Sequence, residues 1–164
     1  MKRLIVMLAM MLPMVAMAEV PGMDNLSKRW SDTEGITVMN LEGAMLQAMI
    51  SSQLDDEEDA AYANEAMNYL KGLKIFACEK RALIGKFTKD VDKMLKKADL
   101  QKLVDVDDKD ERVAIYTRAE GDITTDIVVY VRESDEVALV CVSGDFTAEI
   151  MQGVLGQLGN LTDM

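Results

Sequence analysis

The chain of 164 residues contains no histidine, two cysteines, two prolines and few aromatic side chains. Histidine is the commonest general base near neutral pH and the commonest ligand of zinc and copper. Its absence excludes Ser-His-Asp and Cys-His catalytic pairings and most zinc and copper centres. The sequence also lacks a phosphate-binding glycine loop and a dinucleotide fingerprint. We therefore expect no cofactor, no metal site and no catalytic residues, and we interpret the protein as non-enzymatic.

Basic residues are too few to form a nucleic-acid-binding surface. The sequence has 18 Lys and Arg against 29 Asp and Glu, a formal net charge of −11. A protein that binds DNA or RNA needs a basic stripe that neutralises phosphates. The lysines between Lys86 and Lys97 are instead interleaved with Asp90 and Asp92. We expect no nucleic-acid partner and interpret the charge as that of a solvated surface.

Residues 1–18 have the pattern of a signal peptide. Lys2 and Arg3 precede an apolar run over residues 4–15, and Ala16-Met17-Ala18 fits the cleavage rule for signal peptidase. The run is shorter than the ~20 residues that a transmembrane helix needs. We therefore expect a periplasmic or secreted protein with no integral membrane segment after cleavage, and one domain over residues 19–164. The alternative is an uncleaved N-terminal anchor.

Cys78 and Cys141 are the only thiols, and both lie in apolar runs that are typical of strands. An exported protein can form a disulfide. Two cysteines on strands can be bridged only if their Cα atoms lie within about 7 Å, which a sequence does not reveal. We favour two buried free thiols, because free cysteine is among the most buried residue types, and leave the disulfide as the alternative.

The first half of the chain mixes strands and helices. Apolar periodicity predicts strands over 35–40, 73–78 and 103–106, and helices over 41–50, from 57 to a glycine at 72, and over 81–98. The helix from Glu57 carries Tyr62, Ala66, Tyr69 and Leu73 at helical spacing. Leu103 to Val106 is expected to be a short edge strand.

The second half predicts an antiparallel meander. Strands over 112–118, 126–132 and 136–142 are separated by turn signals at 120–122 and 133–135. Asp145 is the expected N-cap of a final helix, with Phe146, Ile150, Val154 and Leu158 on its buried side. The fold class is therefore α+β, a mostly antiparallel sheet with a C-terminal β-meander packed against three to four helices.

Two strands of the meander are apolar on both sides. The runs 127–131 and 137–142 do not alternate with polar residues, which indicates that both faces are covered. We place Val128, Tyr130, Val140 and Val142 on one side, and Ile127, Val129, Val131 and Leu139 on the other. The second face is covered by helices, by curling of the sheet, or by a protein partner or a second copy in a homo-oligomer.

Two short segments are candidate ligand sites. The loop from Asp105 to Glu111 has five carboxylates, which could attract a cation such as calcium, but Lys109 occupies a ligand position of the calcium-loop pattern. We interpret it as a solvated hairpin-like loop. Ser143-Gly144-Asp145 could present backbone amides to an anion. The acidic side chains of Asp145 and Glu149 argue against this, and we favour a helix-capping turn.

Several segments carry a family resemblance: E-G-I-T-V, L-K-I-F-A-C-E, R-V-A-I-Y and V-S-G-D-F-T-A-E-I. Together they resemble a family of small exported proteins and lipoproteins of Bacteroidetes known as domain of unknown function 4252, over about residues 30–158. The resemblance implies an α+β domain in the cell envelope, with no established activity or site residues, and hints at an envelope-response role. The chain departs from the family's lipoproteins because no cysteine follows the signal peptide.

Two functional hypotheses follow from these patterns. The preferred one is a non-enzymatic envelope protein that acts through protein–protein interaction or envelope-response signalling. The alternative is a carboxylate-based hydrolase or a calcium-dependent glycan-binding module. The first predicts an apolar surface that meets a partner, and the second predicts a cleft with converging Asp and Glu side chains.

Overall fold

The computed structural model of the protein describes residues 20–52 and 68–152. The predicted signal peptide over 1–18 lies outside these residues. So do most of the helix predicted from Glu57 and the residues Val154 and Leu158 of the predicted final helix.

Six strands form one antiparallel sheet, in the spatial order β1-β2-β6-β5-β4-β3. The elements along the chain are α2 (Met23–Trp30), β1 (Ile36–Glu42), α3 (Gly43–Ser52), β2 (Leu70–Cys78), α5 (Arg81–Lys97), β3 (Gln101–Asp107), β4 (Glu111–Glu120), β5 (Ile123–Glu133) and β6 (Val137–Phe146). Strands β4 to β6 form the predicted meander, and β3 adds the predicted edge strand. The α+β prediction is therefore confirmed.

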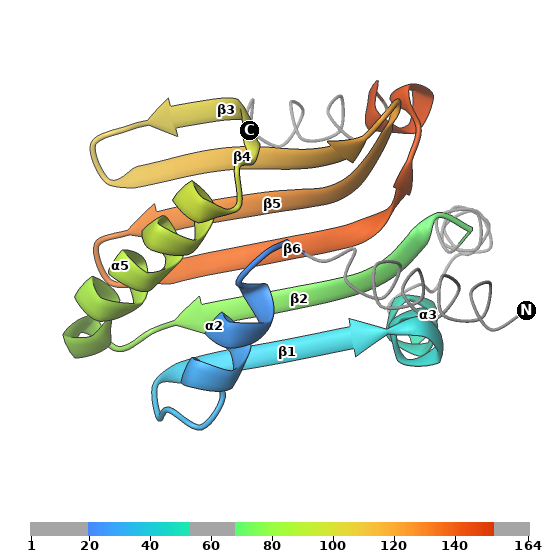
Figure 1. Ribbon diagram of the computed structural model, residues 1–164. Coiled ribbons are helices and arrows are strands. Elements are labelled where there is room, and N and C mark those ends of the chain that lie inside the picture. The colour runs from blue at the N-terminus through green and yellow to red at the C-terminus, as the bar shows by residue number, and fades with distance from the viewer. Residues whose placement is uncertain (1–19, 53–67, 153–164) are drawn as a thin grey trace, which may run out of the picture.

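Helices α2 and α5 cover one side of the sheet, which we call the helix face (Figure 1). Helix α5 presents Phe87, Val91, Met94 and Leu95 to the sheet at helical spacing, and all four are buried. They pack into one core with Phe76 and the short helix α2. This face therefore contains the main hydrophobic core.

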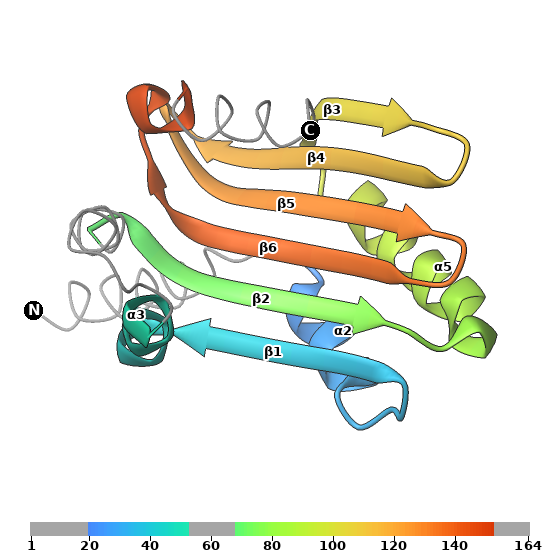
Figure 2. The same ribbon diagram turned by 180° about the vertical axis from the view of Figure 1, so that it is seen from behind.

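The opposite side of the sheet is the back face (Figure 2). Strand register places eighteen residues on it in three rows that run from β1 to β3. The rows are Thr37-Ala77-Ala138-Val131-Val113-Val106, Met39-Ile75-Val140-Val129-Ile115-Val104 and Leu41-Leu73-Val142-Ile127-Thr117-Gln101. No member of these three rows carries a charge, and charge on this face begins beyond the first row, where Glu111 pairs with Glu133 at the turn end of the sheet.

The side assignment made from sequence is wrong for β6. Val128 and Tyr130 share the helix face with Cys141 and Leu139, whereas Val140 and Val142 belong to the back face. The reason is the length of the hairpin turn. Because Glu133 bonds to Glu136, the loop has two residues and not three, which shifts β6 by one residue and turns each of its side chains to the other face.

Several element boundaries also differ from the sequence prediction. Gly72 does not end a helix but lies within β2, and Leu41 belongs to β1 and not to α3. Helix α2 was not predicted from the sequence, because Pro21 and Gly22 directly precede its first residue, Met23. Tertiary pairing overrides the local helical pattern at these positions.

The predicted N-cap at Asp145 is wrong. Strand β6 continues through Phe146, and Asp145 forms an ion pair of 3.2 Å with Lys71 on β2. The helix begins after Thr147, whose hydroxyl accepts a hydrogen bond from the amide of Ile150 at 3.4 Å. Threonine therefore takes the capping position two residues later than expected.

The two edges of the sheet differ in chemistry. Edge strand β3 has an irregular register between Lys102 and Val104 and carries Asp105 and Asp107. Edge strand β1 pairs regularly with β2 along its whole length and carries one charge, at Glu42. The predicted edge strand near residues 103–106 is confirmed.

Cys78 and Cys141 are both buried, and they do not form a disulfide bond. Cys78 lies on β2 and Cys141 on the neighbouring strand β6, both on the helix face. The row in which Phe76 pairs with Leu139 lies between them. The favoured prediction of two buried thiols is confirmed.

Candidate interaction surface

The three uncharged rows of the back face form one continuous surface across the sheet. Each of its three rows crosses all six strands. The central positions Ile75, Val129 and Val140 are half-buried, while Met39 and Val106 at the two edges are 38% and 51% exposed. Contiguous apolar surfaces of this extent are typical of protein interaction sites.

Part of the back face is covered within the chain. Ile150 and Met151, in the short helix after β6, pack against Ile115 and Ile127 at one end of the sheet. Helix α3 lies beside the ends of β1 and β2. Figure 2 shows no described helix across the centre of the back face. The exposed part is therefore the row from Thr37 to Val106 and its neighbours.

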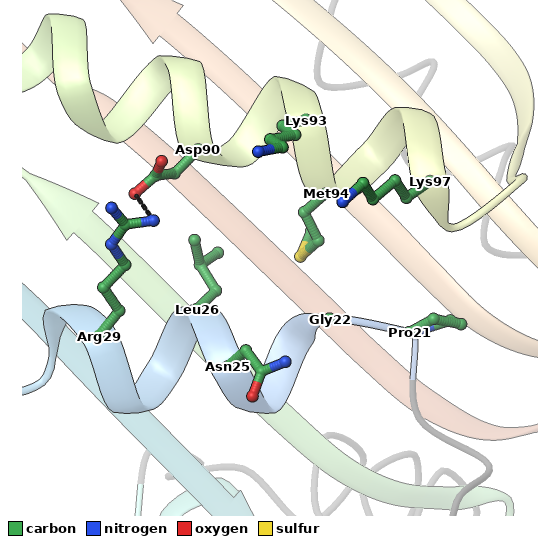
Figure 3. A pocket seen from close by; sticks show the side chains of 9 residues that line it. All are labelled: Pro21, Gly22, Asn25, Leu26, Arg29, Asp90, Lys93, Met94 and Lys97. Atoms are coloured by element: carbon green, nitrogen blue, oxygen red, sulfur yellow. Dashed lines mark ion pairs between the residues drawn. The ribbon is translucent and has the colours of Figure 1, made fainter.

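A groove of about 340 Å³ lies between α2 and α5 on the other side of the molecule. Leu26 and Met94 lie between the two helices, and Lys93 and Lys97 line the α5 side (Figure 3). Asp90 in this groove accepts a hydrogen bond from the Trp30 indole at 3.0 Å and pairs with Arg29 at 3.2 Å. Those two contacts join α2 to α5, so part of the groove's polar chemistry serves the helix packing.

A smaller recess of about 220 Å³ lies where α5 meets the helix face over β4 and β5. Its lining consists of Asp92, Arg112, Ala114, Tyr116, Tyr130 and Arg132. Ala114 stands between Tyr130 and Asp105 in one row of the sheet, with longer side chains in the rows on either side. The small side chain at this position leaves the space that the recess occupies.

The acidic segment from Asp105 to Glu111 is divided between strand and turn. Asp105 receives hydrogen bonds from Arg112 at 3.2 Å and from Lys102 at 3.0 Å, and these hold the pKa of its carboxyl group down at about 2. Asp108 and Glu111 exchange backbone hydrogen bonds across the hairpin turn. The hairpin interpretation is confirmed. Among residues 20–52 and 68–152, no three Cys, Asp or Glu side chains converge on a common point that could hold a metal ion.

Ser143 takes part in a buried polar cluster and does not face an anion site at a helix terminus. Its hydroxyl donates to the fully buried carboxylate of Asp126 at 2.8 Å, and Thr125 donates to the same carboxylate at 2.9 Å. Arg118 lies 3.7 Å away. Burial is the main cause that raises the pKa of Asp126.

A family match covers most of this architecture. Residues 30–154 match the family described as domain of unknown function (DUF4252), a span that runs from Trp30 at the end of α2 past the last described strand. The chain belongs to the DUF4252 family. No curated protein and no solved structure matches it. The family resemblance seen in the sequence is thus confirmed.

Sequence reasoning did not find the recess or the Asp126 cluster of this DUF4252 protein. Arg112, Tyr130 and Asp92 come from three elements, and only the sheet register and the position of α5 bring them together. Asp126 was assigned simply to the start of a strand. The only signal in the sequence was the pair of polar residues Thr125 and Asp126 directly before the apolar run.

None of the helices that the structure describes is long and apolar enough to cross a membrane.

Proposed function

We propose that this DUF4252 protein is an exported, non-enzymatic component of the cell envelope that acts through protein–protein contact at its back face. Export is supported by the charged start, the apolar run and Ala16-Met17-Ala18. The observation that carries the interaction is the set of three uncharged rows on the back face, which cross six strands with no described helix over their centre.

The chemistry of this face indicates what its partner presents. Burying an unpaired charge against Val129 or Val140 would be costly, so the partner surface must also be uncharged where it meets them. A flat sheet face matches another sheet, because two sheets pack about 10 Å apart with interdigitated side chains. In a protein with a net charge of −11, the back face of a second copy satisfies both conditions.

A pair of adjacent substitutions tests this proposal. Val128 is fully buried on the helix face, whereas Val129 is half-buried on the back face. We expect Val128→Lys to destabilise the fold by about 3–5 kcal/mol, because the ammonium is left buried without a partner. Val129→Lys should keep its helical content and thermal transition but lose self-association. Circular dichroism and sedimentation equilibrium measure the two properties.

The wild-type protein is the reference in both measurements. A wild type that sediments as a dimer, together with a folded monomeric Val129→Lys variant, supports the proposal. A wild type that is monomeric at all concentrations and binds no envelope protein, together with unfolding of both variants, would show that the chain covers its own back face and would overturn the proposal.

A further inference from the structure

We propose that the recess between α5 and strands β4 and β5 binds a small oxyanion, a carboxylate or a phosphate. The proposal concerns the helix face and is independent of any association through the back face. It rests on a cavity of about 220 Å³, on its excess of hydrogen-bond donors and on a buried hydroxyl that makes no hydrogen bond of ordinary length.

The two arginines of the recess have guanidinium N–H groups that the described residues do not use in hydrogen bonds. Arg112 uses Nε and one Nη for Asp105, at 3.2 Å each, which fixes the plane of its guanidinium group. Arg132 approaches Asp92 at 3.8 Å and the Tyr130 ring at 5.7 Å, and neither contact is a hydrogen bond. The remaining N–H groups of both guanidinium groups have no acceptor in the described part of the chain. Paired guanidinium groups are the side chains best suited to carboxylate and phosphate oxygens.

The buried hydroxyl group of Tyr130 adds a donor to the lining of the recess. Tyr130 is 3% exposed, and its hydroxyl makes no hydrogen bond of ordinary length among the described residues, although Thr88 and Asp92 lie near enough to shift its pKa. The hydroxyl of Thr88, one helical turn before Asp92 on α5, is in the same condition. An unsatisfied buried polar group costs free energy, so such groups require an explanation. An anion in the recess supplies the missing acceptor for Tyr130.

Charge and size agree with a small anion. The lining itself has two guanidinium groups against one carboxylate, that of Asp92, while the Asp105 carboxylate that binds Arg112 lies outside the lining. Its volume corresponds to about seven water molecules, which leaves room for an ion of a few heavy atoms and its waters. The Asp105 contact is already formed, so Arg112 needs little reordering when an anion enters.

Titration of the full-length exported chain with sodium acetate and, separately, with sodium phosphate tests the proposal. Sodium chloride at equal ionic strength serves as the reference for screening. We expect saturable shifts of the Ala114, Arg112 and Arg132 resonances in ¹⁵N–¹H spectra. Saturation by acetate alone identifies a carboxylate site, and saturation by phosphate alone identifies a phosphate site. Shifts that never saturate with either salt overturn the proposal.

Matched variants locate the binding. Arg132→Gln should weaken binding about tenfold, because it removes a charged donor from a half-exposed position. Tyr130→Phe should weaken binding while thermal stability stays equal or rises, which separates a ligand role from a packing role. Lys97→Gln removes one charge from the groove between α2 and α5 and should leave the affinity unchanged. Equal weakening in Lys97→Gln and Arg132→Gln would show attraction to general positive charge and would overturn the site.

Discussion

The two faces of the sheet differ in what covers their apolar side chains and in whether they carry charge. On the helix face, the apolar core under α2 and α5 stands beside charged side chains on β2, β5, β4 and β3, among them Lys74, Asp126 and Arg112. On the back face, all three rows remain uncharged to both edges although few described residues cover them. The helix face therefore mixes charged side chains with a covered apolar core, whereas the three rows of the back face have no charge and little cover from the described residues. A sequence that keeps these three rows uncharged to both edges supports contact with something beyond this chain.

The largest test of this comparison truncates neighbouring residues on opposite faces. Leu139 is fully buried on the helix face, and Val140 is half-buried on the back face. We expect Leu139→Ala to lower the free energy of unfolding by about 2–5 kcal/mol, because it leaves a cavity. Val140→Ala should cost about 1 kcal/mol in the monomer. Urea denaturation of both variants measures the difference, and equal losses in dilute monomer would mean that the two faces are equally buried.

The reactivity of thiols at adjacent positions compares the accessibility of the two faces. Cys78 and Cys141 are buried on the helix face, and Ala77 lies on the back face beside Cys78. In an Ala77→Cys variant, we expect the new thiol to react with a disulfide reagent on the order of 100-fold faster than the two natural ones in dilute native protein.

Protein concentration provides the control for this labelling. If two copies meet through their back faces, labelling of the new thiol should slow as concentration rises, while the natural thiols stay slow throughout. Slow labelling of all three thiols at every concentration would contradict an accessible back face. After denaturation, all three thiols should react.

A smaller effect concerns pH and distinguishes the faces by charge. Asp126 is fully buried on the helix face, and burial raises its pKa. A carboxyl group with a raised native pKa binds protons more strongly in the folded state. Its contribution to stability is therefore complete below the unfolded pKa of about 3.9 and is lost as pH rises through the raised native value.

The Asp126→Asn variant has no such titration. We expect the stability of the wild type relative to this variant to fall as pH rises from about 3 to 7, as measured by urea midpoints across that range. Because the back-face rows have no titratable group, the Val140→Ala variant should follow the wild-type pH dependence. A wild type that gains stability relative to Asp126→Asn over this range would show that Ser143, Thr125 and Arg118 outweigh burial.

Local pattern was enough to predict much of the fold. The spacing of Phe87, Val91 and Leu95 identified α5, and the turn signals around Gly121 identified a hairpin of the meander. Apolar runs in β5 and β6 correctly indicated that a second face needed explanation. Such features depend on periodicity within one element, which the sequence displays directly.

Features that depend on register could not be predicted in the same way. Whether Ser134 and Asp135 form a two-residue loop or share a longer turn decides which side Val140 faces, and local composition does not distinguish them. The recess needs Arg112, Arg132 and Asp92 from three elements. The strand character of Leu70 to Gly72 likewise arises from pairing with β1 and β6 and not from the local pattern.

The irregular, charged edge at β3 also bears on the size of any assembly. A regular, bare edge strand can recruit further strands one after another, so that association proceeds without limit into a fibre. The break in register between Lys102 and Val104, with Asp105 and Asp107 beside it, obstructs that growth at one end of the sheet. Stacking through the back face is different, because two copies that meet through it cover that face on both molecules. If the proposed contact forms, it would therefore end at a pair.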